Sequence, residues 1–118
     1  MTTHPATAPP AAVVDADEES FEIRVIDESH RRLVLVDFWA AWCAPCVALT
    51  PTLESLAGEY RGCFLLAKVE VDDNMRLAGR YKLRGFPTVI LFRNGEQVAH
   101  FVGNKPRHHV RELVQAHI

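Results

Sequence analysis

The sequence predicts an α/β sandwich built on a mixed central β-sheet. Two mostly apolar stretches rich in branched residues, 33–38 and 64–71, have the composition of strands that are buried on both faces. Helical patterns follow each of them, and Asn94-Gly95, a strong hairpin signal, separates two further strand-like stretches. Strands that alternate with helices and end in a hairpin are typical of this fold class.

The N-terminal part of the chain contains a tail, a short strand and a helix. Residues 1–11 hold almost nothing that a core could bury, and we interpret them as a disordered tail. Residues 12–14 are expected to form a short edge strand. Residues 15–18 have the pattern of a capping box for a helix that runs through Phe21 and Val25.

The elements after the strand at 33–38 follow in a regular order. Apolar residues recur at helical spacing from Leu49 to Tyr60, and after the strand at 64–71 we expect Asp72 to cap another helix. Stretches 89–92 and 97–102 are expected to pair as a hairpin. Asn104 and Pro106 then open a final helix with Val110, Leu113 and Val114 on one face.

Composition and charge place the chain among ordinary globular proteins. Its 118 residues suit one domain, which we expect to span 12–118, and 48% of them are hydrophobic and 24% charged. The net charge of −2 and the lack of a basic stripe predict no nucleic-acid partner. The longest apolar runs are far shorter than the roughly 20 residues of a membrane helix, so we expect no membrane partner. The N-terminus lacks the features of a secretory signal, which favours a cytoplasmic location.

The most informative motif is Trp42-Cys43-Ala44-Pro45-Cys46, which lies between a predicted strand and a predicted helix. This placement puts Cys43 at the helix N-terminus, where the helix dipole stabilises a thiolate and lowers its pKa. Cys46 lies one turn further along, within reach of the first sulfur. The arrangement suits dithiol–disulfide exchange, with Cys43 as the nucleophile and Cys46 as the thiol that resolves the mixed disulfide.

The alternative interpretation of the cysteine pair is a structural zinc site. Zinc needs two further ligands, and only Cys63 with His108 or His109 is available, without helpful spacing. We therefore predict no metal. Cys63 follows Arg61-Gly62 at the start of a strand and is interpreted as a bystander, with a regulatory thiol as the alternative.

The motif is one of five features that occur in order from about residue 33 to the end of the chain. They are residues 37–46, Pro51, residues 67–72, residues 84–88, and residues 92–96 with 102–103. Together they resemble the thioredoxin family. The resemblance implies a thioredoxin fold, with a mixed sheet of four to five strands flanked by about four helices. Ala44, where the family usually has glycine, and Val47, where it often has lysine, depart from the pattern.

Asp37 interrupts an otherwise apolar strand, and burial should raise its pKa. In the family this position assists proton transfer to and from the second cysteine, so the resemblance implies that Asp37 is the general base for Cys46. Lys68, on the neighbouring strand, is the expected ionic partner of Asp37. The alternative is that Asp37 is a solvated residue at the end of its strand.

The resemblance also implies a surface for docking substrates. Pro87 is expected to follow a cis peptide bond, which exposes the backbone of Phe86 beside the cysteines for pairing with an extended substrate. A flat apolar patch of this kind on a soluble protein commonly marks a partner site. Its expected members are Trp42, Ala44, Pro45, Phe86, Pro87 and Gly103.

The resulting functional hypothesis is a protein disulfide reductase without a bound cofactor. Its expected partners are disulfide-containing proteins and an NADPH-dependent thioredoxin reductase, and we expect it to be a monomer. The rival hypothesis is a chaperone or assembly module that binds through its apolar surface. An oxidase or isomerase is disfavoured by Pro45 and by the absence of a signal sequence.

Overall fold

The computed structural model describes residues 12–118, and the tail predicted for residues 1–11 lies outside the described residues. Its centre is a five-stranded sheet in the order β1-β3-β2-β4-β5. The strands are β1 (Val13–Asp15), β2 (Leu33–Trp39), β3 (Phe64–Glu70), β4 (Thr88–Arg93) and β5 (Glu96–Val102). β3 pairs in parallel with β1 and β2, whereas β4 pairs antiparallel with β2 and β5. The mixed sheet predicted from the sequence is confirmed.

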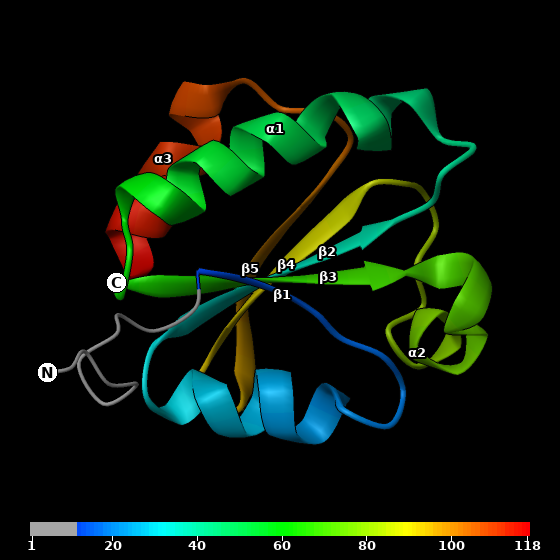
Figure 1. Cartoon of the computed structure of the whole chain (residues 1–118), viewed down its shortest axis with the longest axis horizontal. Helices are drawn as coiled ribbons and strands as arrows, with labels where there is room; N and C mark the ends of the chain where they lie inside the picture. Colours follow the sequence, from blue (N-terminus) through cyan, green and yellow to red (C-terminus); the bar gives the residue numbers. More distant parts are fainter. Residues whose placement is uncertain (1–11) are drawn as a thin grey trace, which may run out of the picture.

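The described part of the chain also forms three α-helices and three further helical turns, which lie between the strands except for α3, which follows the last one. The helices are α1 (Ala44–Glu59), α2 (Met75–Arg80) and α3 (Arg107–His117). The turns are the π-helical η2 (Glu22–Asp27) and the 3₁₀-helical η3 (Glu28–His30) and η4 (Val71–Asp73). In Figure 1, α1 and α3 cover one face of the sheet, and the η2–η3 segment covers the other. Within the described part of the chain, no helix is both long and apolar enough to cross a membrane.

The alternation of side chains along β2 divides the core into two layers. Leu33 and Leu35 pack with Leu49 and other leucines of α1, whereas Val34, Val36 and Phe38 belong to the layer that contains η2. Successive residues of a strand point to opposite faces, so Asp37 lies on the α1 face of the sheet. Residues 33–38 are all fully buried, as predicted for a strand covered on both sides.

The predicted capping box at residues 15–18 is wrong by two positions. The backbone N–H of Ala16 donates to the Lys68 carbonyl at 2.9 Å, so the chain still pairs with β3 there and cannot yet enter a helix. The reciprocal bonds form instead between Asp17 and Ser20, at 3.0 and 2.8 Å.

The predicted capping role of Asp72 is also wrong. Asp72 lies inside η4, and α2 begins only after Asn74. The amide of Asn74 donates to the Glu70 carbonyl at 2.8 Å and accepts from the Glu18 backbone N–H at 2.9 Å. Asn74 therefore joins the end of β3 to the segment after β1, and the carboxylate of Asp72 is left to make a different contact, described below.

Candidate active site

The two cysteines of the motif are joined in a disulfide at the start of α1. Cys43 occupies the N-cap position with an extended backbone, and its Cα lies 5.3 Å from that of Cys46. The backbone N–H of Cys46 donates to the Cys43 sulfur at 3.3 Å. Pro45 is tolerated in this first turn because its missing N–H would have no partner within the helix. Cys43 is 6% exposed and Cys46 is fully buried, so an approaching substrate can meet only Cys43.

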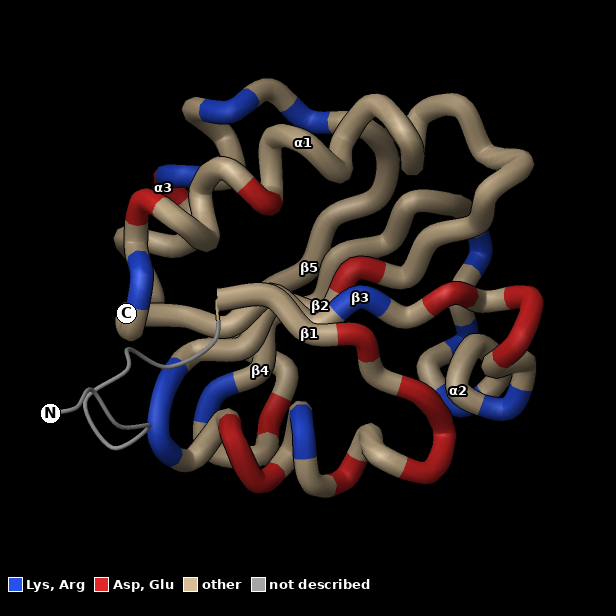
Figure 2. The backbone as a smooth tube through the Cα atoms, in the orientation of Figure 1, with Lys and Arg blue, Asp and Glu red and all other residues tan. Residues whose placement is uncertain are grey.

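No charged side chain comes from the segment that carries the disulfide. Residues 38–53 include no Asp, Glu, Lys or Arg, and Figure 2 shows an uncharged stretch from the end of β2 into α1. The helix N-terminus is therefore the nearest source of positive potential along the chain for a thiolate at Cys43. The neighbouring Val47 is 54% exposed and adds apolar surface beside the disulfide.

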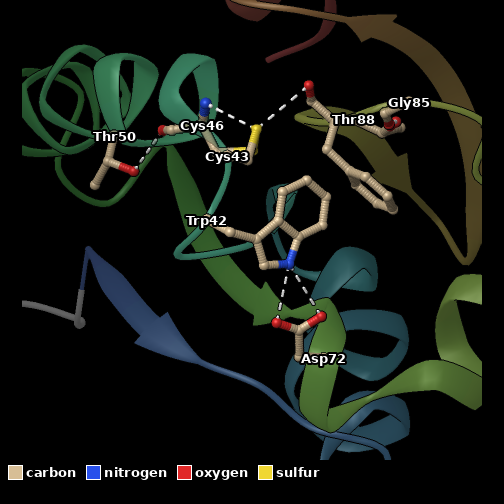
Figure 3. Close-up of a disulfide and its surroundings, with 8 residues drawn as sticks. Trp42, Cys43, Cys46, Thr50, Asp72, Gly85 and Thr88 are labelled. Atoms are coloured by element: carbon tan, nitrogen blue, oxygen red, sulfur yellow. Dashed lines mark hydrogen bonds between the residues drawn. A yellow bond between two sulfur atoms is a disulfide. The ribbon is translucent and has the colours of Figure 1, made fainter.

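The loop before β4 faces the disulfide, as Figure 3 shows. The antiparallel pairing of β2 with β4 brings this loop to the end of β2 where the motif begins. The peptide bond between Phe86 and Pro87 is cis, and the Phe86 carbonyl oxygen lies 3.5 Å from the Cys43 sulfur. The Gly103 backbone N–H donates to the Pro87 carbonyl at 2.8 Å, so the start of the loop after β5 is tied to the same place.

Trp42 stands beside the disulfide and is 66% exposed. Its indole N–H donates to both carboxylate oxygens of Asp72, at 3.1 and 3.3 Å (Figure 3). Its ring also meets the ring of Phe86 edge-on, with centroids 6.1 Å apart. Trp42 is thus held in place from both sides while most of its surface stays open.

An apolar recess of about 410 Å³ opens next to Trp42, and sequence reasoning missed it. Its lining residues come from η4, α2 and the loop before β4: Val71, Asp72, Met75, Ala78, Gly79, Lys82, Leu83 and Phe86, with Trp42 itself. Met75 is 66% exposed. The signal in the sequence was Met75, at the first position of the short helix α2. A single methionine does not indicate which side chains fold around it.

Asp37 is fully buried, and neither of its carboxylate oxygens has a hydrogen-bond partner. Burial raises the pKa of Asp37 to about 7; the Lys68 ammonium acts in the opposite direction and Glu54 adds to the increase. The alternative of a solvated strand end is excluded. A carboxyl group that titrates near neutral pH can accept or donate a proton under ordinary conditions.

The expected ion pair between Asp37 and Lys68 is not formed. The two residues are register neighbours on adjacent strands, but the Lys68 ammonium lies 2.8 Å from the carboxylate of Glu54 on α1. The Lys68 side chain is 21% exposed and that of Glu54 is 42% exposed. Pairing there leaves both charges partly hydrated, which costs less than burying an ammonium beside Asp37.

The remaining predictions concern Ala44, Pro45, Cys63 and the possibility of a metal site. Ala44 and Pro45 are exposed at the start of α1 and add to the surface around Trp42. Cys63 is exposed and free, away from the disulfide in the sequence and the fold. In the described part of the chain, no three His, Cys, Asp or Glu side chains gather as a metal site would require.

A pair of cysteines at the N-terminus of a helix that packs on a mixed sheet is the arrangement of a thiol–disulfide oxidoreductase, and this protein has it. The family model named Thioredoxin matches residues 12–116. The chain therefore belongs to the thioredoxin family, and it is a protein disulfide reductase that acts by dithiol–disulfide exchange.

Curated relatives match almost the full length of the chain. Thioredoxin from Chlorobaculum thiosulfatiphilum is 38% identical, over 88% of this chain and 94% of its own length. Thioredoxin C-2 from Corynebacterium nephridii is 40% identical, over 92% and 98%. Thioredoxin from Staphylococcus saprophyticus is 36% identical, over 91% and 99%.

Proposed function

We propose that Cys43 is the attacking thiolate and Cys46 the resolving thiol in the reduction of disulfides in partner proteins. The Cys43 thiolate attacks one sulfur of the substrate disulfide; a new S–S bond forms to Cys43, and the other substrate sulfur leaves as a thiolate. Cys46 then attacks the Cys43 sulfur, and the second substrate sulfur leaves and takes a proton. The observation that carries this assignment is the N-cap position of Cys43, slightly exposed above a fully buried Cys46.

Asp37 is proposed as the group that accepts the proton of Cys46 in the second step. It is buried on the α1 face of the sheet and has no hydrogen-bond partner, and its raised pKa matches proton transfer near neutral pH. Lys68 contributes through its charge, since it lowers the pKa of Asp37 without contacting the carboxyl. Asp37→Asn should therefore slow substrate release while the attack of Cys43 stays fast.

The docking surface is proposed to consist of the predicted residues together with the recess. The predicted residues are Trp42, Ala44, Pro45, Phe86, Pro87 and Gly103. A substrate strand would lie along the Phe86–Pro87 backbone, where the Phe86 carbonyl borders the Cys43 sulfur. An apolar side chain of the substrate would enter the recess beside Trp42.

The protein is further proposed to act as a monomer in the cytoplasm, within a route that carries electrons from NADPH. An NADPH-dependent thioredoxin reductase would return the disulfide seen here to the dithiol, which the reaction consumes at each turnover. We expect a reduction potential of about −270 mV, the value typical of thioredoxins. Trp39 and Trp42 offer a fluorescence signal for a titration in dithiothreitol buffers.

The proposal is tested by trapping the intermediate. Cys46→Ser should retain a disulfide-bonded partner protein as a covalent adduct that thiol reagents release, because the resolving sulfur is gone. Cys43→Ser, the matched control, should trap nothing, since no nucleophile meets the substrate. Equal trapping by both variants, or trapping by Cys43→Ser alone, would overturn the assigned roles.

A chaperone or assembly role is the second candidate, and the exposed apolar side chains of Trp42, Val47 and Met75 favour it. Such binding would not need the sulfurs. The double variant Cys43→Ser, Cys46→Ser separates the two functions: a reductase loses all activity, whereas a binding module still suppresses aggregation of an unfolded test protein.

A further inference from the structure

We propose that Glu54 is a positioning residue, which holds the Lys68 ammonium and so keeps the Asp37 carboxyl without an ionic partner and able to carry a proton. The inference rests on the proposed role of Asp37 as the proton acceptor of Cys46. It adds a third charged residue, from α1, to the pair that the sequence singled out.

The strand register makes Lys68 the natural partner of Asp37. Asp37 and Lys68 are directly paired positions on adjacent parallel strands, and their side chains project to the same face of the sheet. A flexible four-carbon stem gives the ammonium freedom to choose a direction. In the structure it is paired with Glu54 at 2.8 Å, and both oxygens of Asp37 lack a hydrogen-bond partner.

Helix α1 places Glu54 where it can compete for the ammonium. Cys46, Thr50 and Glu54 follow one another at intervals of four residues, so they form one stripe along the helix. The stripe begins at the buried sulfur and ends at a half-exposed carboxylate. Glu54 therefore lies on the same face of α1 as Cys46, nearer the solvent, and binds Lys68 there.

Among the described residues, the charges that act on the pKa of Asp37 come from two elements, β3 and α1. Burial has the largest effect and raises the pKa of Asp37; Lys68 on β3 lowers this pKa, and Glu54 on α1 raises it further. On the other neighbouring strand the residue paired with Asp37 is Val89, which is uncharged. Asp15 of β1 is also paired with Lys68, but on the far side of β3 from Asp37.

The two positions of the ammonium have opposite consequences for Asp37. An ammonium bound to Glu54 is partly neutralised and directed away from the carboxyl. An ammonium released from Glu54 would turn to the nearest negative charge, and an opposite charge within about 4–6 Å favours the ionised carboxylate. The affinity of Asp37 for a proton thus depends on whether Glu54 holds Lys68.

The first test is the titration of Asp37 itself in the oxidised protein. The ¹³C chemical shift of its carboxyl carbon is measured as a function of pH, and the signal is assigned by its loss in Asp37→Asn. In Glu54→Gln the pKa of Asp37 should fall by about one pH unit. Glu59→Gln is the matched control: it is the same change on the same helix, of a side chain that is also 42% exposed and ion-paired. An unchanged titration in Glu54→Gln would overturn the proposal.

A second comparison distinguishes positioning from simple repulsion between two carboxylates. In a Lys68→Met background, Glu54→Gln should lower the pKa of Asp37 much less than in the wild type, because no ammonium remains to be released. An equal fall in both backgrounds would show that Glu54 acts on Asp37 directly, and the positioning role would be wrong.

A kinetic readout separates this inference from the proposed function. If Asp37 accepts the proton of Cys46, the pH profile of substrate release in Glu54→Gln should move to lower pH together with the titration of Asp37. A titration that moves while the release profile stays fixed would overturn the role of Asp37 as proton acceptor, and with it the positioning role of Glu54 in the reaction. A profile that moves in Glu59→Gln as well would show a general charge effect and overturn the inference alone.

Discussion

Trp42 and Asp72, which both line the recess, are joined by a hydrogen bond. The indole N–H, at the residue before Cys43, donates to both oxygens of a carboxylate located 30 positions further along the chain. The bond links the loop after β2 to the turn after β3. It fixes the orientation of the largest exposed aromatic side chain beside the disulfide.

Asp72→Ala should release Trp42 and weaken the use of protein substrates. We expect a severalfold higher KM for a disulfide-bonded protein, because a mobile indole must be ordered on binding. The reduction of a small-molecule disulfide should be unchanged, since it does not need the recess. Asp72→Asn keeps an acceptor for the indole and should restore most of the loss; equal loss in both variants would point to charge instead of orientation.

The buried carboxyl of Asp37 should make stability depend on pH. Its pKa is raised from 3.8 to about 7 in the folded protein, so the folded state binds more protons than the unfolded state between these values. Stability therefore falls as the pH rises through this window and then levels off. Above pH 7 the ionised group costs on the order of 4 kcal/mol.

Urea unfolding of the oxidised protein, compared with Asp37→Asn, measures this effect. The variant should gain stability relative to the wild type between about pH 4 and pH 7 and hold a constant advantage above that. The other ionisable groups are shared by the two proteins and cancel in the difference. A difference that does not change with pH would show that Asp37 titrates normally.

Ser29 should stabilise the attachment of the hairpin to η2 through two partly buried hydrogen bonds. Its fully buried hydroxyl donates to the Ile26 carbonyl at 2.6 Å and accepts from the Gly95 backbone N–H at 2.8 Å. Ser29→Ala leaves the N–H without a partner and should cost about 1–3 kcal/mol of unfolding free energy. Ser55→Ala, at an exposed position of α1, should cost far less in the same chemical denaturation experiment.

A side chain at Gly103 should lower the free energy of unfolding because of the backbone geometry at this position. Its φ is +94°, in the region that L-residues disfavour, although an added Cβ would meet no atom within 4 Å. Gly103→Ala should therefore cost about 1–2 kcal/mol from the backbone alone. Gly58→Ala, with equal space in helix α1 and no positive φ, should instead be neutral or stabilising in a thermal melt.

Local patterns were enough to predict the sheet and the position of the dithiol. The strand at 33–38 is buried on both faces, and its composition alone indicates that. The turn at Asn94-Gly95 is a two-residue signal that needs no distant contact, and both residues have positive φ. Cys43 at the start of α1 follows from the boundary between two such patterns.

The predictions that failed depend on contacts between distant segments. Lys68 could be placed beside Asp37 from the strand register, but its choice of Glu54 depends on where α1 crosses β3. The spacing from Cys46 to Glu54, two steps of four residues, was a signal that could have found it. The role of Asp72 was missed because its partner, Trp42, lies in another part of the sequence.

The placement of the Cys43 sulfur 3.5 Å from a carbonyl 43 residues further along the chain has a consequence for synthesis of the protein. A nascent polypeptide that has emerged only as far as β3 already carries both thiols, yet it lacks the backbone edge on which a substrate would align. With the substrate aligned on this edge as proposed, selective reduction should begin only once β4 has docked against β2. Turnover of a protein substrate should then report completion of the sheet.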